Sequence, residues 1–90
     1  MGHMTNAYTF RKEFHISHHM MLSIEKYIEK RQPVGDFLSA VICNDLKGAV
    51  SFADDVNIHN LPAYVGYFYN EAPHNCWGSS KKMKEWLKGK

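Results

Sequence analysis

Residues 61–70 have the sequence LPAYVGYFYN, which predicts a helix rich in aromatic rings. Apolar side chains recur there at helical spacing and form one stripe, consisting of Leu61, Val65 and Phe68. Pro62 falls in the first turn, where a missing backbone N–H is tolerated. Tyr64 and Tyr67 flank the stripe. Because a domain this small cannot bury every ring, we expect these tyrosines either to be partly buried or to line a groove or a subunit interface.

The segments before this helix also show helical spacing. Ser17 is a candidate N-cap for a helix that ends before Pro33, since the residue before a proline avoids the helical region. The inward residues of that helix are Met21, Ile24, Tyr27 and Ile28. Asp36 can cap the next helix, whose apolar spacing runs from Phe37 to Ala53. Asn44-Asp45 can cap a break within it, so one helix over 36–54 and two abutting helices both remain open.

The segments around and after residues 61–70 complete the predicted fold. DDVNIHN is expected to be a polar connector, and Ala72-Pro73 ends the aromatic helix. Ser79 or Ser80 then caps a last helix whose inward residues are Met83, Trp86 and Leu87. These elements predict an all-α fold, a compact single domain of four to five short helices around one core.

The domain boundaries follow from length and local composition. Ninety residues make one domain. Residues 1–4, MGHM, are typical of a cloning remnant. Residues 5–16 form an N-terminal arm in which YTFRKEF is either a short strand or an ordered extended segment. Residues 17–90 are the helical domain.

Charge and cysteine content narrow the function classes. The net charge is +2, from 11 basic and 9 acidic residues, which is too balanced to indicate a dedicated nucleic-acid binder. Lysines nevertheless crowd the C-terminal segment. Two cysteines cannot make a disulfide framework, so a reducing cytoplasm fits best. The longest apolar run, FLSAVIC, is far shorter than the ~18 residues that span a membrane, and no membrane association is expected.

Three clusters suggest chemistry, and each has a simpler explanation. His74 and Cys76 are two residues apart in a loop, a spacing that seldom gives the geometry of nucleophilic catalysis. The histidines at 15, 18 and 19 lack further ligands for a zinc site. The 54–57 segment lacks the glycine and glutamate of a calcium loop. We therefore expect no catalytic residues, no metal and no cofactor.

The stretch EAPHNCWGSSKK, residues 71–82, leads into the last predicted helix. The helix start at Ser79 offers free backbone N–H groups and the positive end of the helix dipole, with Lys81 and Lys82 close by. This combination suits a phosphate or carboxylate group. A plain N-cap explains the same residues, and the spaced glycines of a P-loop are missing.

Most of the chain, from about Leu22 to Leu87, resembles a group of short phage and prophage proteins. The similar segments are YIEKRQPVGDFLSAVICNDLKGAV, ADDVN and LPAYVGYFYNEAPHNCWGSSKKMKEWL, of which YNEAPHNCWGS is the most specific. Some members look like the phage sponges that sequester cyclic oligonucleotides, the second messengers of a bacterial anti-phage defence. The resemblance implies a helical homo-oligomer that binds its ligand without cleaving it, in the host bacterial cytoplasm.

The residues and the resemblance together predict a non-enzymatic phage protein that captures a cyclic oligonucleotide or another small anionic ligand. A base can stack on an aromatic ring while a phosphate sits at the helix start. The candidate binding residues are Tyr64, Tyr67, Trp77, Ser79, Ser80, Lys81 and Lys82. Two alternatives remain open: a protein–protein module that binds a host factor through the tyrosine face, and a nucleic-acid-binding accessory protein that uses the lysine-rich C-terminal helix.

Overall fold

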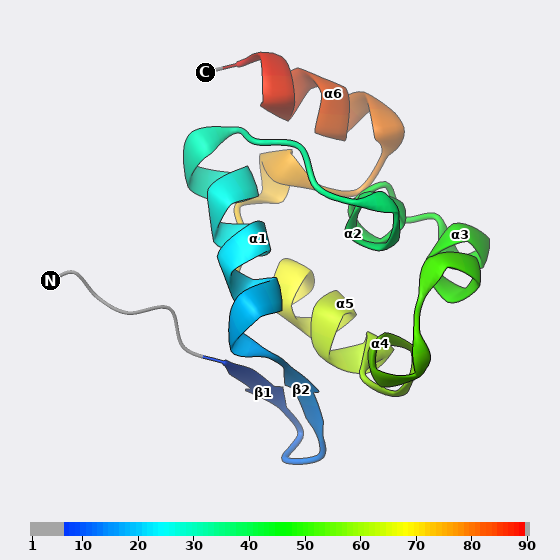
Figure 1. Ribbon diagram of the computed structural model, residues 1–90. Helices are drawn as coiled ribbons and strands as arrows, with labels where there is room; N and C mark the ends of the chain where they lie inside the picture. Colours follow the sequence, from blue (N-terminus) through cyan, green and yellow to red (C-terminus); the bar gives the residue numbers. More distant parts are fainter. Residues whose placement is uncertain (1–6, 90) are drawn as a thin grey trace, which may run out of the picture.

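The segment before the first helix forms a β-hairpin in the computed structural model, which describes residues 7–89 (Figure 1). β1 (Tyr8–Phe10) pairs antiparallel with β2 (Phe14–Ile16). The prediction of a strictly all-α domain is therefore wrong, although the chain is mostly helical. The physical reason is visible in YTF and FHI, where apolar and polar residues alternate with the period of a strand. The predicted remnant at 1–4 and the first two residues of the arm lie outside the described residues.

Six α-helices follow the hairpin within residues 7–89. They are α1 (His18–Lys30), α2 (Asp36–Ile42), α3 (Leu46–Phe52), α4 (Asp55–His59), α5 (Leu61–Asn70) and α6 (Ser80–Lys88), and a 3-10 turn, η1 (His74–Cys76), precedes α6. In this part of the chain no helix has both the length and the apolar character needed to cross a membrane. The described domain is thus built from short helices and one hairpin (Figure 1).

Capping side chains explain where several helices begin. The 36–54 segment is two helices, because Asn44 has a left-handed φ of 62° and the Asp45 carboxylate accepts the Gly48 N–H at the start of α3. The predicted cap of α2 is off by one residue, since Gly35 is the N-cap. The expectation of a connector at DDVNIHN is wrong, because Asp54 caps the short helix α4.

The core lies around α5, which packs against α2, α4 and both strands of the hairpin. Its fully buried side chains include Tyr27, Tyr64, Phe68, Ile16, Ile24, Ile42 and Cys76. The predicted stripe on α5 is partly wrong, because Val65 is 52% exposed whereas Tyr64 is 1% exposed and packs edge-on against Phe37. The hairpin packs on another side of α5, where a Cβ on Gly66 would lie 2.6 Å from a ring carbon of Phe10.

Hydrogen bonds to buried groups tie the C-terminal segment to the first two helices. The Tyr27 hydroxyl of α1 donates to the Cys76 carbonyl at 2.6 Å, and the Trp86 indole N–H donates to the Tyr27 carbonyl at 3.0 Å. The Gly78 N–H donates to the Ile42 carbonyl at the end of α2, at 2.7 Å. Arg31 adds a cation–π contact, with its guanidinium 3.5 Å from the Trp86 ring centroid. The loop between α5 and α6 therefore has a defined position.

We expect Tyr27→Phe to lower the free energy of unfolding by about 1–2 kcal/mol, because the buried Cys76 carbonyl loses its hydroxyl donor. Urea denaturation measures the change. Tyr69→Phe is the matched control, since that side chain is 69% exposed and its loss of a hydroxyl should change stability by less than about 0.5 kcal/mol. Equal stability of the two variants would contradict the structural role of the Tyr27 hydrogen bond.

Gly66→Ala should destabilise the protein by about 1–3 kcal/mol, because the added methyl forces Phe10 and the hairpin away from α5. Gly35→Ser provides the control, since a Cβ there meets nothing within 4 Å and serine is a favoured N-cap for α2. Thermal unfolding followed by circular dichroism compares the two. A Gly66→Ala protein as stable as Gly35→Ser would show that the hairpin does not pack on α5 as described.

Candidate functional site

The start of α6 borders a hollow of about 430 Å³ that is lined by Tyr69, His74, Trp77, Gly78 and Lys82. We call it the Trp77 hollow. Its residues come from the end of α5, from η1 and the loop after it, and from the first turn of α6. All of these residues except Tyr69 lie in the EAPHNCWGSSKK segment, where the sequence predicts an anion site, and Trp77 and Lys82 are among the predicted ligand contacts.

Local sequence shapes this loop. Helix α5 ends at Asn70, and Pro73 precedes the turn η1. Gly78 has a φ of +117°, a conformation that glycine adopts without steric cost, and its N–H is bonded to α2. Ser79 then caps α6 as predicted, because its hydroxyl accepts the Lys82 N–H at 3.0 Å. The loop therefore places the start of α6 next to the indole of Trp77.

Two aromatic rings form the apolar part of the hollow. The rings of Tyr69 and Trp77 meet edge to face, with centroids 6.3 Å apart and planes at 71°. Tyr69 is 69% exposed, so its ring is accessible to a ligand. The Trp77 Nε1 atom is buried and has no hydrogen-bond partner among the described residues. A buried N–H group without an acceptor raises the free energy of the folded protein, and an ordered water molecule that accepts its hydrogen bond removes this cost.

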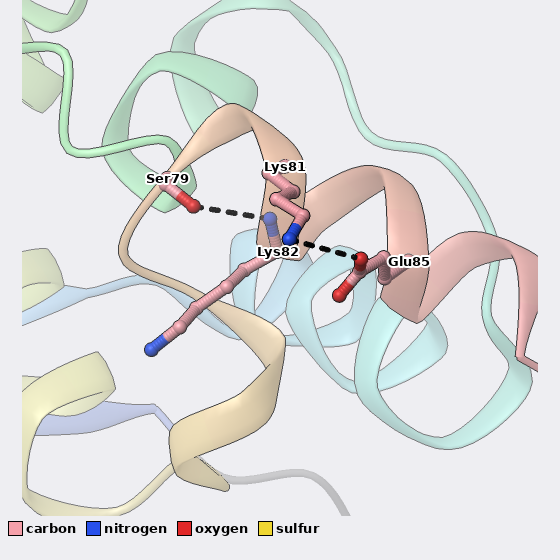
Figure 2. Close-up of polar contacts among 4 residues, drawn as sticks. All are labelled: Ser79, Lys81, Lys82 and Glu85. Carbon is pink, nitrogen blue, oxygen red and sulfur yellow. Dashed lines mark hydrogen bonds and ion pairs between the residues drawn. The ribbon is translucent and has the colours of Figure 1, made fainter.

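The two lysines of the first turn differ in direction (Figure 2). The Lys81 ammonium folds back along α6 and lies 3.7 Å from a carboxylate oxygen of Glu85, in an exposed ion pair. Lys82 runs away from α6, and its Nζ passes 3.7 Å from the position of a Cβ on Gly78. Lys82 therefore supplies the positive charge of the hollow, together with the dipole of the helix start.

The other predicted ligand contacts do not line the Trp77 hollow. Tyr64 is buried in the core and donates to the Asn57 side-chain oxygen at 2.8 Å, so it cannot offer its ring to a ligand, and that prediction is wrong. Tyr67 is half-buried and meets Tyr8 edge to face, with centroids 5.2 Å apart. Ser80 is exposed and does not line the hollow.

The sequence predictions missed Tyr69 and Gly78 as contributors to the hollow. A usable signal was present for Tyr69, because it is one residue past Phe68 and so points away from the face that Phe68 buries. Burial of Tyr64 and Phe68 on one face of α5 leaves Tyr69 on the exposed face, beside the loop that follows.

The residues considered for catalysis and for metal binding do not form such sites in the structure. Cys76 is fully buried, and burial raises the pKa of its thiol to about 11, which keeps it protonated and a poor nucleophile at neutral pH. His15 lies in β2 and His19 in α1, so they share no helical face. Within residues 7–89 no three His, Cys, Asp or Glu side chains gather closely enough to hold a metal ion.

Comparison of the chain with protein-family models, with curated proteins and with solved structures finds no match. The resemblance to phage sponge proteins is therefore still a prediction. The argument about function rests on the geometry and chemistry of the Trp77 hollow.

We expect the Cys76 thiol to resist Ellman's reagent in the folded protein at pH 8, because its raised pKa and full burial leave almost no accessible thiolate. The measurement uses Cys43→Ser, in which Cys76 is the remaining cysteine. Reaction should become fast when urea unfolds the chain. Rapid labelling of the folded protein at pH 8 would contradict the burial of Cys76.

The raised pKa of Cys76 also affects stability. Because the pKa in the folded protein is raised above the ordinary thiol value of 9.0, Cys76 should lower the free energy of unfolding as the pH rises from about 9 to 11.

Proposed function

We propose that the protein is a non-enzymatic binder that captures a small anionic nucleotide in the Trp77 hollow. The observation that carries the proposal is the combination, in one hollow, of two aromatic rings with the Lys82 ammonium at a capped helix start. A nucleotide needs these two environments side by side, since its base is flat and apolar on its faces and its phosphate is charged.

Each part of the hollow has a role in this proposal. The exposed Tyr69 ring offers a face for base stacking, which contributes about 1–3 kcal/mol per base. The Lys82 ammonium and the first-turn N–H groups of α6 bind the phosphate, as free N–H groups at helix starts do. The Trp77 ring lines the hollow beside Tyr69 and adds apolar surface for the base.

The size of the hollow bears on the kind of nucleotide. A volume of about 430 Å³ is in the range of small-molecule sites and holds one nucleotide unit. A cyclic oligonucleotide would place one base and one phosphate there and leave the rest of its ring outside. The resemblance to phage sponge proteins supports this ligand class, and with it a role in blocking anti-phage signalling in the host bacterial cytoplasm.

The lysine-rich helix α6 favours a second candidate, binding of nucleic acid. Lys81, Lys84 and Lys88 recur at helical spacing and are exposed, so they form a short basic stripe. Glu85 reduces this positive charge because it pairs with Lys81. Nucleotide capture depends on Lys82, whereas nucleic-acid binding depends on Lys84 and Lys88. Substitutions of these lysines therefore distinguish the two candidates.

Isothermal titration calorimetry with a panel of cyclic di- and trinucleotides tests the proposal. Lys82→Ala should weaken binding about tenfold, because a charge-assisted hydrogen bond of roughly 1.5 kcal/mol is lost. Tyr69→Ala should weaken binding by a similar factor through lost stacking. Lys81→Ala is the matched control, since its ammonium pairs with Glu85 and does not line the hollow.

No heat from any nucleotide, or an equal loss for Lys81→Ala and Lys82→Ala, would contradict capture in the Trp77 hollow. Binding of DNA or RNA that falls steeply with salt and depends on Lys84 and Lys88 would instead support the basic stripe. Ligand recovered after denaturation distinguishes capture from turnover, because a binder returns it intact and an enzyme returns a product.

A further inference from the structure

His74 also lines the Trp77 hollow, and the base and phosphate contacts proposed above do not use it. It is the first residue of η1, between Pro73, whose ring fixes φ at −60°, and the buried Cys76, whose carbonyl is bonded to Tyr27. The imidazole is exposed, and within residues 7–89 it has no hydrogen-bond or ion-pair partner. Its ring nitrogens are therefore available to a ligand in the hollow.

The lining of the hollow contains basic side chains and no acidic one. Lys82 reaches the hollow from the first turn of α6, and His74 reaches it from η1, so two separate elements supply nitrogen donors. Glu71, the C-cap of α5, is exposed and does not line the hollow. On α6, the Glu85 carboxylate pairs with Lys81. In the lining itself, no carboxylate competes with an anion for the donors of His74 and Lys82.

We propose that His74, in its protonated form, is a second phosphate-binding side chain of the Trp77 hollow, beside Lys82. This inference rests on the nucleotide capture proposed above. One phosphodiester oxygen accepts a hydrogen bond from the imidazolium, while the Lys82 ammonium and the first-turn N–H groups of α6 bind the others. The Tyr69 ring, the remaining titratable group of the lining, is left to stack on the base.

The size of the hollow agrees with a phosphate held from two sides. A sphere of 430 Å³ is about 9 Å across, and a phosphate with hydrogen bonds of about 2.8 Å on either side spans about 8 Å. Both side chains can therefore contact the same phosphate without a change in the backbone of the loop.

The protonated form makes capture depend on pH. Histidine is the side chain that ordinarily changes its charge between pH 5 and 8, whereas a phosphodiester keeps its negative charge over this range. The imidazolium contact is therefore present at the acidic end of the range and lost as the pH rises, so the affinity for the nucleotide falls. A bound phosphate in turn favours the protonated imidazole, so ligand binding and proton uptake reinforce each other.

Isothermal titration calorimetry at pH 5.5 and at pH 8, at one ionic strength, tests the role of His74. The probe is the cyclic di- or trinucleotide of the panel that binds most tightly. We expect wild type to bind about tenfold more tightly at pH 5.5, the effect of one charge-assisted hydrogen bond. His74→Gln should lose this ratio and keep the wild-type affinity at pH 8, since glutamine gains no charge. His18→Gln, at an exposed position that begins α1 and does not line the hollow, is the matched control and should keep the ratio.

Proton uptake is a second readout. Titrations at pH 6.5 in two phosphate-free buffers of different ionisation heat should show uptake of part of a proton by wild type and none by His74→Gln. Wild-type affinity that is equal at both pH values overturns the role of His74 and leaves nucleotide capture standing. A ratio that survives in His74→Gln, or that disappears in His18→Gln, also overturns it. Absence of binding at both pH values overturns nucleotide capture and this inference together.

Discussion

The buried hydroxyl of Tyr27 is the constraint on which the arrangement of the C-terminal third depends. A hydroxyl inside an apolar core is tolerated only when it is hydrogen-bonded, and its acceptor is the carbonyl of Cys76, 49 residues away. Burial raises the pKa of this hydroxyl above its ordinary value, so it stays protonated and remains a donor. The carbonyl of the same residue accepts the Trp86 indole N–H. One residue of α1 thus positions both ends of the segment that contains the Trp77 hollow.

The side chains that line the Trp77 hollow are positioned by the same hydrogen bonds. With Cys76 held against α1 and Gly78 bonded to the end of α2, the loop between them has little freedom. Trp77 lies between these two anchors, and Lys82 follows one turn into α6. A site whose parts are held before the ligand arrives loses less entropy on binding, which is how a small domain can bind tightly with few contacts. In this chain the same bonds that complete the core therefore also organise the candidate site.

Sequence patterns predicted the helices with strong signals and failed where tertiary contacts decide. The Ser79 cap was predictable because hydroxyl residues at helix starts have a local physical role. Tyr64 was named as a ligand contact wrongly, because α5 is apolar on nearly all sides and its sequence alone does not show which side the core covers. Helix α4 was missed because five residues are too few for a periodic signal. Its carboxylate cap, Asp54, was the available clue.

The two tryptophans allow a direct test of nucleotide capture by NMR, since each indole N–H gives its own ¹H–¹⁵N resonance. Trp86 donates to the Tyr27 carbonyl, whereas Trp77 lines the hollow and its buried N–H has no partner among the described residues. Titration with a cyclic oligonucleotide should shift the Trp77 indole signal and the Gly78 and Lys82 amide signals, and should leave the Trp86 indole signal in place. Saturating ligand that moves no signal of the Trp77 hollow, or that moves only signals elsewhere, would contradict the account.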